Sequence, residues 1–545
     1  MNTIQKSLAL AGVLALVAPA TAQFHGVAEL DPTTTGFGLT TYPPMLRGDT
    51  AATGNGWTAT PLFTVGETLG NYTPIGLLDG IGAFPRNPTT ALVLVSHEAS
   101  EALGYAYKLD NGTQLTGARI STFVLSRTVD QAGVVTTSLK RAGPAFGKVY
   151  DRQGVLVTNP AQINEVGDPL KGLSRFCSSQ SVLAGTYGFV DDVFFAGEET
   201  GKPSVPHGGS EWALDVKTRS LWAAPALGRM AWENVTPLDG GDASKVALLC
   251  GDDTASSPLY LYVGEKGAIG DGSFLDRNGL AVGKLYAWKT SNGDLTPQQF
   301  NGLNSFRSGS FVEVTVQDVA QAGQPGYDAF GYADGDTLAA QADALGCFSF
   351  SRPEDLATNP LDGTQAVFAS TGRGQLFPAD NWGDVYVVDV DFATLTADVV
   401  IVHDADALAV PDSGIRNPDN LCWADNGKVY VNEDRSTSPS SLFGGSTGIE
   451  ASLWQLDPIT RVYTRVAEID RSAVAPTGST DSAPSDLGNW ESSGVLDVTS
   501  FFQTLPGERL LITDVQAHSV SDGPLGGGSN LVEGGQLLFV SKIGN

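Results

Sequence analysis

The chain has 545 residues and a formal charge of −28, from 32 Lys and Arg against 60 Asp and Glu. With 41% hydrophobic residues it can bury a large core, which excludes a disordered chain, and four cysteines are too few for a disulfide-stapled scaffold. The excess of acids argues against nucleic acid or an anionic membrane surface as a partner, because Lys and Arg hold phosphate groups.

The first 22 residues have the pattern of a secretory signal peptide. Lys6 precedes an apolar run from Leu8 to Val17, and the small residues Ala20-Thr21-Ala22 predict cleavage after Ala22. No later stretch approaches the roughly 18 apolar residues that a membrane span needs. We therefore expect a signal peptide over 1–22, no membrane segment in 23–545, and a secreted or periplasmic monomer. A retained N-terminal anchor is the alternative.

Residues 23–545 consist mainly of short apolar runs, rich in Val, Leu, Phe and Tyr and separated by Gly, Asp, Asn and Pro. This pattern is typical of strands and hairpins. The clearest runs are 91–95, 193–196, 246–249, 259–263, 283–288, 385–390, 428–431, 509–513 and 536–540. Long apolar patterns with a helical period are almost absent, so the sequence predicts an all-β chain.

Three stretches share one outline: a strand that ends in Asp, a polar turn and a returning strand. They are 209–222, 385–402 and 451–465. This outline is typical of the outer hairpin of a propeller blade. Six blades of about 45 residues would use roughly half of the chain. We therefore predict a six-bladed β-propeller over 23–545, a single catalytic domain with long loop insertions such as 439–448 and 475–485. Two β-sandwich domains are the alternative.

Acidic residues follow several of the predicted strands. The pairs are His97-Glu98, Glu198-Glu199, Glu233-Asn234, Asp252-Asp253, Glu354-Asp355, Asp419-Asn420 and Glu433-Asp434. Strand ends of different blades converge at the channel of a propeller, and converging carboxylates repel one another unless cations lie between them. Oxygen ligands suit calcium. The sequence therefore predicts several bound metal ions, although any single pair could be a solvated turn.

The four cysteines, Cys177, Cys250, Cys347 and Cys422, are widely spaced. Because export permits disulfides, the spacing favours two bridges, in any of three connectivities. The alternative is that Cys177 is a thiolate ligand of a softer transition metal. The Gly444–Gly448 segment matches G-x-S-x-G but follows no strong strand, so we do not expect a nucleophilic serine there.

An ordered set of short motifs runs from about residue 170 to 425. It comprises Cys177, Gly197-Glu-Glu-Thr200, Gly228-Arg-Met-Ala-Trp-Glu233, Gly251-Asp-Asp253, Ser351-Arg-Pro-Glu354 and Asn417-Pro-Asp-Asn-Leu421. In this order the motifs resemble the PhoX-type alkaline phosphatases, a secreted family of six-bladed β-propellers with an iron and calcium active site. The resemblance implies a metal-dependent phosphomonoesterase that hydrolyses small phosphate esters at a metal cluster in the channel.

The resemblance also implies roles for individual residues. Cys177 and Glu233 would hold iron, Glu198, Glu199 and Glu354 would hold or bridge calcium, and Arg352 would bind the ester phosphate. Asp252, Asp253, Asp419 and Asn420 would be calcium ligands or would support the ligands. Arg352 and Glu354 are thus the expected catalytic residues. Cations of this kind would reverse the local charge of an acidic chain, and the planar fork of Arg352 can bind two phosphoryl oxygens.

Two other functions remain open, because a fold does not determine a function. One is a calcium-dependent hydrolase of the lactonase or phosphotriesterase kind, and the other is a non-enzymatic binding propeller stabilised by calcium. Arg352 beside Glu354 favours the phosphomonoesterase, since a dianionic monoester needs a cation that a neutral lactone does not.

Overall fold

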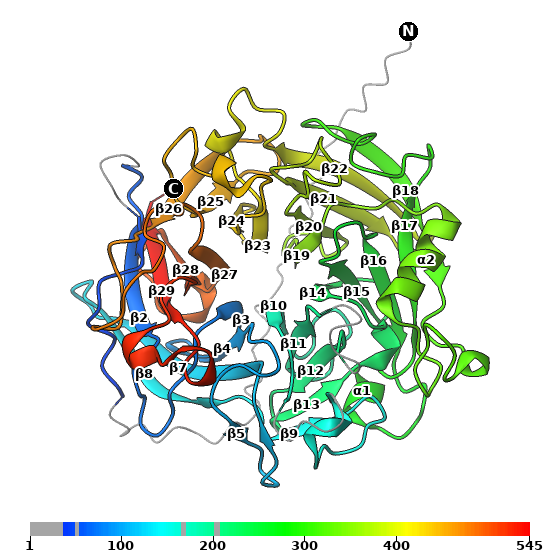
Figure 1. Cartoon of the computed structure of the whole chain (residues 1–545), viewed down its shortest axis with the longest axis horizontal. Coiled ribbons are helices and arrows are strands. Elements are labelled where there is room, and N and C mark those ends of the chain that lie inside the picture. The colour runs from blue at the N-terminus through cyan, green and yellow to red at the C-terminus, as the bar shows by residue number, and fades with distance from the viewer. Residues whose placement is uncertain (1–35, 49–53, 165–170, 201–207, 545) are drawn as a thin grey trace.

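The computed structural model describes residues 36–48, 54–164, 171–200 and 208–544, so the predicted signal peptide lies outside the described residues. The described residues form sheets arranged around a central axis (Figure 1), and their strands pair antiparallel except for β9 with β13. Two α-helices, α1 (Phe274–Arg277) and α2 (Gly335–Leu345), lie towards the rim. Among the described residues no helix is long and apolar enough to cross a membrane.

The sheets divide into six four-stranded units that follow one another along the chain, each ordered from the centre to the rim. The innermost strands are β3 (Leu78–Asn87), β10 (Phe176–Val182), β14 (Trp232–Leu238), β19 (Pro353–Thr358), β23 (Pro418–Trp423) and β27 (Glu491–Asp497). The second strands are β4 (Thr90–His97), β11 (Val193–Glu198), β15 (Lys245–Asp252), β20 (Gln365–Ser370), β24 (Val429–Glu433) and β28 (Glu508–Ala517).

The outer half of each unit is a further pair of strands. The third strands are β7 (Arg119–Val129), β12 (Glu211–Asp215), β16 (Tyr260–Glu265), β21 (Asp384–Asp391), β25 (Ser452–Leu456) and β29 (Gly534–Ile543). The fourth strands are β8 (Val135–Pro144), β13 (Ser220–Ala223), β17 (Gly283–Thr290), β22 (Thr396–Asp404), β26 (Tyr463–Ile469) and β2 (Thr58–Thr64). The three hairpins predicted as outer hairpins are β12–β13, β21–β22 and β25–β26, as expected.

Five short or linking strands complete the sheets. β1 (Leu46–Arg47) pairs with β26, β9 (Lys148–Tyr150) pairs with β13, and β5 (Tyr107–Lys108) pairs with β6 (Gln114–Leu115). β18 (Phe306–Val314) pairs with both β17 and β22 and so joins two units into one nine-stranded sheet.

The innermost strands contact one another in a closed ring, in the order β3, β10, β14, β19, β23, β27 and back to β3. β2 closes the sixth unit by pairing with β29, so this unit combines strands from both ends of the described chain (Figure 1). The β-propeller with long insertions is confirmed, and the two predicted surface loops lie between β24 and β25 and between β26 and β27.

The disulfides that the spacing favoured are not formed: all four cysteines are free and buried. Cys250 and Cys347 pack as small apolar side chains in one core cluster, and Cys422 packs in another. Cys177 lies at the start of the innermost strand β10. The prediction was wrong because burial as free thiols, rather than pairing, accounts for these residues.

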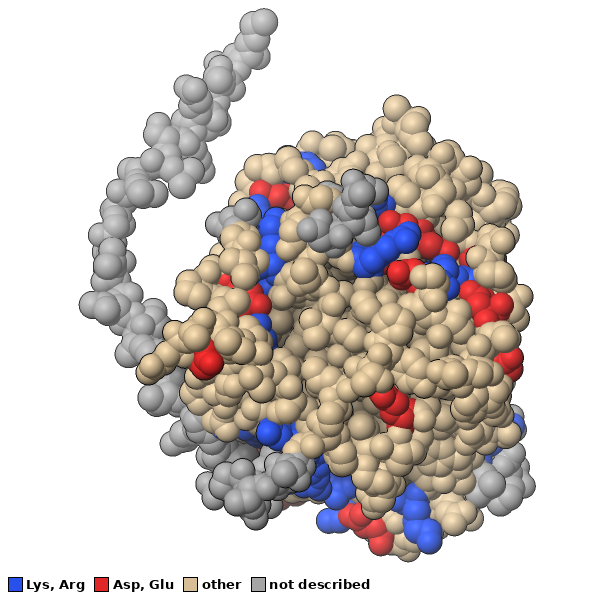
Figure 2. Space-filling view, turned by 90° about the vertical axis from the view of Figure 1, so that its left-hand side faces the viewer, with Lys and Arg blue, Asp and Glu red and all other residues tan. Residues whose placement is uncertain are grey.

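Charge on the outer surface is mixed. On the side of the molecule shown in Figure 2, Lys and Arg lie beside Asp and Glu in small groups, and most of the surface is uncharged. Ion pairs such as Arg47–Glu468, at 3.1 Å, join neighbouring outer strands. The excess of acids is therefore not gathered into one patch on this side, and part of it lies inside the ring of innermost strands.

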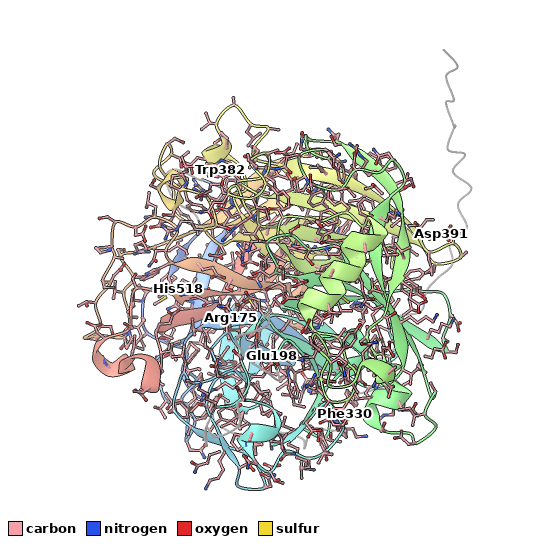
Figure 3. All side chains as sticks on the ribbon, turned by 45° about the vertical axis from the view of Figure 1, so that its right-hand side comes forward. Arg175, Glu198, Phe330, Trp382, Asp391 and His518 are labelled. Carbon is pink, nitrogen blue, oxygen red and sulfur yellow. The ribbon has the colours of Figure 1, made fainter. Side chains whose placement is uncertain are left out.

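Closure of the ring depends on apolar contacts between the last and the first unit. Phe63 of β2 is fully buried and its ring lies 5.4 Å from that of Phe123 of β7. Phe63→Ala is expected to lower the free energy of unfolding by about 3–5 kcal/mol, because it leaves a cavity in this contact. Thermal and denaturant unfolding would measure the change. Phe330→Ala, at a rim residue that is 48% exposed (Figure 3), should change stability by less than about 0.5 kcal/mol. Equal effects would contradict the assignment.

Candidate active site

Every innermost strand carries an irregularity near its beginning. The register against the second strand shifts between Leu78 and Ile81, Phe176 and Ser179, Trp232 and Val235, Pro353 and Leu356, Pro418 and Leu421, and Ser492 and Val495. A β-bulge leaves residues out of the ladder and redirects their side chains. The bulged pairs are Asp79-Gly80, Cys177-Ser178, Glu233-Asn234, Glu354-Asp355, Asp419-Asn420 and Ser493-Gly494. Five of the six units therefore place an acid or a thiol at the same position.

A second ring of residues, polar in five of the six units, lies at the ends of the second strands. At the end of each second strand, or one residue before the end in β28, a residue pairs with the start of the innermost strand in the same unit, as Glu198 does with Phe176 and Asp252 does with Trp232. The next residue along the chain is Glu98, Glu199, Asp253, Thr371, Asp434 or Ala517. The antiparallel pairing thus brings both rings to the same end of the channel.

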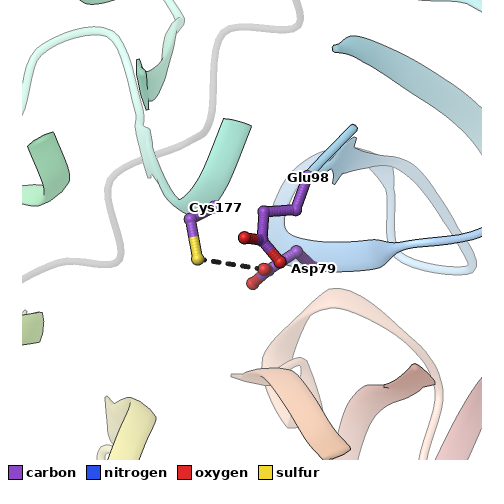
Figure 4. A group of neighbouring side chains, drawn as sticks. All are labelled: Asp79, Glu98 and Cys177. Atoms are coloured by element: carbon purple, nitrogen blue, oxygen red, sulfur yellow. Dashed lines mark hydrogen bonds between the residues drawn. The ribbon is translucent and has the colours of Figure 1, made fainter. Parts of the chain in front are cut away.

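The two rings meet in one cluster of possible metal ligands. Three groups have ligand atoms within 4.8 Å of one another: Asp79, Glu98 and Cys177; Cys177, Glu199 and Glu233; and Glu233, Glu354 and Asp419. Because Cys177 and Glu233 each belong to two groups, the seven side chains form a continuous arc across five units. Figure 4 shows the first group, in which the Cys177 thiol donates to Oδ2 of Asp79 at 3.1 Å.

Burial makes this cluster electrostatically costly in the absence of cations. Burial and the neighbouring Glu98 raise the pKa of Asp79 to about 7. Burial and the surrounding acids likewise raise the pKa of the Cys177 thiol and of the Glu233 carboxyl well above their usual ranges. Oε2 of Glu233 and Oδ1 of Asp419 are buried without a hydrogen-bond partner in the described chain. A bound cation would satisfy these acceptors and offset the charge of the carboxylates.

Two arginines lie at the edge of the cluster, each directly before an innermost strand. Arg175 and Arg352 have φ of 47° and 65°, the left-handed region that non-glycine residues adopt where the surroundings hold them. Arg175 contacts Glu98 at 2.6 Å and also bonds Glu199. Its place near the middle of the molecule is visible in Figure 3.

Arg352 contacts both rings. Its Nε donates to Oδ1 of Asp253 at 2.6 Å, and its Nη2 lies 2.9 Å from Oε1 of Glu354. Burial opposes ionisation of Asp253, but Arg352 outweighs it and lowers the pKa of that carboxyl. Nη1 donates to Oγ of Ser436 at 2.8 Å. Arg352 therefore links the metal-ligand cluster to the loop that follows β24.

A histidine lies on the sixth unit. His518 is held between Glu491 (Nε2 to Oε2, 3.3 Å) and Glu533 (Nδ1 to Oε1, 3.0 Å). Burial opposes its protonation, but the two carboxylates outweigh burial and raise the pKa of His518 well above the usual range. The sixth unit, which has serine rather than an acid in its bulge, thus brings a cation to its part of the site.

The predicted site residues fall into three sets. Cys177, Glu199, Glu233, Glu354 and Asp419 belong to the cluster. Asp253 pairs with Arg352, and the Asn420 amide donates to Oδ1 of Asp79 at 3.1 Å.

Glu198 and Asp252 lie outside the three ligand groups. Oε1 of Glu198 accepts from the Ser174 backbone at 3.0 Å, and Asp252 accepts from the hydroxyls of Thr254 and Ser257 at 2.8 Å. Successive side chains of a strand point to opposite sides, which separates each of these acids from the one that follows it.

Sequence reasoning missed Asp79, Arg175 and His518, and it noted Glu98 without assigning it a role. A signal for Asp79 was present. Leu78-Asp-Gly-Ile81 has the same outline as Pro418-Asp-Asn-Leu421, an acid and then a small or amide residue before the apolar run. Aligning these short segments as one repeat would have found it.

Residues 215–462 match the family model of the alkaline phosphatase PhoX. This confirms the predicted resemblance to PhoX. On this match the protein is a phosphoester hydrolase, as predicted. The matched segment contains Glu233, Arg352, Glu354 and Asp419, whereas Cys177 and the Glu198-Glu199 pair precede it.

Among solved structures, Pseudomonas fluorescens PhoX in complex with vanadate, a transition state analogue, is similar to this chain. The TM-score is 0.58 at 17% identity, over 92% of this chain and 97% of that chain, which shows a shared fold. Cobalt-substituted Synechocystis ACO has a TM-score of 0.31 at 11% identity, over 81% of this chain and 87% of that chain, too low to support an argument. No curated protein sequence matches the chain significantly.

The raised pKa of Asp79, about 7, predicts how the metal-free protein responds to pH. Between the usual carboxyl pKa and about 7 the folded protein holds a proton that the unfolded chain does not, so stability is lost as pH rises through 7. After metal removal by chelation and dialysis, the protein should melt at a higher temperature at about pH 6.5 than at about pH 8.5. Asp79→Asn should reduce the difference. A melting temperature that rises with pH would contradict the prediction.

Proposed function

We propose that the protein is an exported phosphomonoesterase that hydrolyses small phosphate esters with calcium and iron bound in the propeller channel. The observation that carries the proposal is the continuous arc of seven ligand side chains, five of them buried and two half-buried, with Arg352 at its edge. It lies in a chain whose residues 215–462 match PhoX. The predicted signal peptide over 1–22 supports export.

The donor atoms fit these metals. The group of Glu233, Glu354 and Asp419 offers only carboxylate oxygens, as hard calcium prefers, and two of its oxygens have no other partner among the described residues. The groups that contain Cys177 add a soft thiolate, which suits iron. We therefore assign iron to Cys177 with Glu199 and Glu233, and calcium to the carboxylate group.

The remaining predicted acids have supporting roles in this proposal. Glu198 accepts from the backbone of Ser174, beside Arg175, and so fixes the turn that leads into β10. Asp252 fixes the turn after β15 through Thr254 and Ser257. Asn420 and Ser178 each follow a ligand on a bulge. The Asn420 amide donates to Asp79, and the Ser178 hydroxyl accepts from the Asn234 amide. These contacts keep the ligands in place before a metal binds.

When bound, the metals would neutralise charge on the phosphoryl group in the transition state and lower the pKa of an attacking water. Arg352 would bind the phosphoryl oxygens. Its guanidinium presents a planar fork that already pairs with Asp253 and Glu354, and a phosphate dianion can accept from the same N–H groups.

Glu354 connects the two parts of the site. It belongs to the carboxylate group, contacts Arg352 at 2.9 Å and accepts from the Thr371 hydroxyl at 2.9 Å. It would therefore fix the distance between the metals and the arginine. This geometry favours a dianionic monoester over the neutral substrate of a lactonase, and the family match favours an enzyme over a binding propeller.

The purified protein is expected to hydrolyse p-nitrophenyl phosphate and to contain calcium and iron by elemental analysis. Chelation should abolish turnover, because the buried acids then lose the charge that compensates them. Glu233→Gln should lower both the metal content and kcat, the latter by at least about tenfold, since Glu233 belongs to two ligand groups.

The matched control is Glu313→Gln, an exposed glutamate on β18 that pairs with Lys284. It should leave the metal content and turnover unchanged. Full metal content with full activity in Glu233→Gln would remove this residue from the centre. Calcium without any turnover would contradict the proposed activity.

Arg352→Ala is expected to raise KM and to lower kcat for p-nitrophenyl phosphate, because Arg352 would contact both the substrate and the transition state. The combined loss in kcat/KM should be about 100-fold or more, with the metal content retained. Arg352→Lys keeps the charge but not the fork and should recover only part of the activity. Unchanged kinetics in Arg352→Ala would exclude it from the site.

A further inference from the structure

A cavity of about 510 Å³ lies beside Arg352, on the outer side of the cluster. The loops after β20 and β24 form much of its wall, and the side chains that matter are those of Arg352, Arg373, Gln375, Arg435, Ser436 and Ser438. This volume exceeds what a phosphate group fills and falls in the range of small-molecule sites, about 300–1,000 Å³. A phosphate ester bound at Arg352 would place its alcohol portion here.

The cavity carries an excess of positive charge in an acidic protein. Arg352 is paired with Asp253, and Arg435 is paired with Asp486, Nη2 to Oδ2 at 3.1 Å. Arg373 is exposed, and its side chain has no hydrogen bond or ion pair within the described residues. One full arginine charge therefore remains available to a ligand in the cavity that Arg352 also lines.

The walls of the cavity are tied together by hydrogen bonds. Gln375 donates to the Ser438 hydroxyl at 3.1 Å, and the Ser438 backbone donates to Asn381 at 2.9 Å. Ser436 accepts from Arg352 and donates to the Gly372 carbonyl at 3.1 Å. The loop that carries Arg373 is thus fixed to the loop that carries Arg435, and a fixed wall lowers the entropy that binding must overcome.

We propose that this cavity is a subsite for the alcohol portion of the substrate and that it selects phosphate esters bearing a second anionic group, a carboxylate or another phosphate. Arg373 supplies the unpaired cation, and Arg435 with the Ser438 hydroxyl supplies further donors. The inference rests on the proposed function, since it gives the class of substrate for the same site.

A matched pair of substrates tests the subsite. Glucose 6-phosphate and 6-phosphogluconate release the same kind of primary alcohol, but only the second carries a carboxylate at the far end. Wild type should have the higher kcat/KM for 6-phosphogluconate. Arg373→Ala should lower that value about tenfold, mainly through KM, and should change the value for glucose 6-phosphate less than about twofold.

Three further variants separate charge from position. Arg373→Lys keeps the positive charge and should retain most of the preference for 6-phosphogluconate. Arg373→Glu places a negative charge beside the carboxylate of the substrate and should reverse the preference. Arg141→Ala, an exposed arginine on the distant strand β8, should change neither substrate. An equal effect of Arg373→Ala on both substrates, or no effect on either, would overturn the subsite.

The result remains decisive if the proposed activity fails. Without turnover of p-nitrophenyl phosphate or of either sugar phosphate, the phosphomonoesterase proposal is wrong. Binding of 6-phosphogluconate by calorimetry then tests the cavity. A Kd that is about tenfold weaker in Arg373→Ala than in wild type would support the anion subsite, and equal affinities would overturn it.

Discussion

The structure depends on the repulsion among carboxylates that five units of the propeller bring to one end of the channel. Asp79, Glu233, Glu354 and Asp419 come from innermost strands and are all buried. Ionised together they would oppose folding, and protonated they could not bind a cation. Two devices in the chain moderate this cost: Arg175 and Arg352 lie against the cluster, and the remaining buried oxygens are left open to cations.

The repeated bulge explains how a regular fold can build such a site. A propeller places equivalent residues of each unit around one axis, but an ordinary strand would direct them alternately into the sheets on either side. The bulge at the start of each innermost strand interrupts this alternation at the same point. The first residue of the bulge is Asp, Cys, Glu or Ser in different units. This one position therefore sets the chemistry of the site, while the strands of the six units remain alike.

The sequence predicts the fold well because strand patterns are local. The outer hairpins at 209–222, 385–402 and 451–465 were recognisable from their own residues. Acids at strand ends could be located in the same way. Whether such an acid joins the metal-ligand cluster depends on the strand register to within one residue, which the composition does not reveal. Glu198 and Glu199 look equivalent in the sequence, and only the register at Phe176 separates them. The cysteines were wrongly predicted to form disulfides. An oxidising compartment permits a disulfide only where the fold brings two sulfur atoms together, and here all four thiols are free.

The distribution of charge also bears on how the substrate is recognised. A chain of charge −28 repels a phosphate ester at long range, so attraction must arise within a few ångströms of the site. Bound cations would supply it at the cluster, and Arg352 extends it outwards to the cavity. Arg373 also lines this cavity, and within the described part of the chain its side chain has no carboxylate partner. A second anion on the substrate is the simplest group that would compensate this charge, and it would also orient the ester with its phosphate towards the metal ligands.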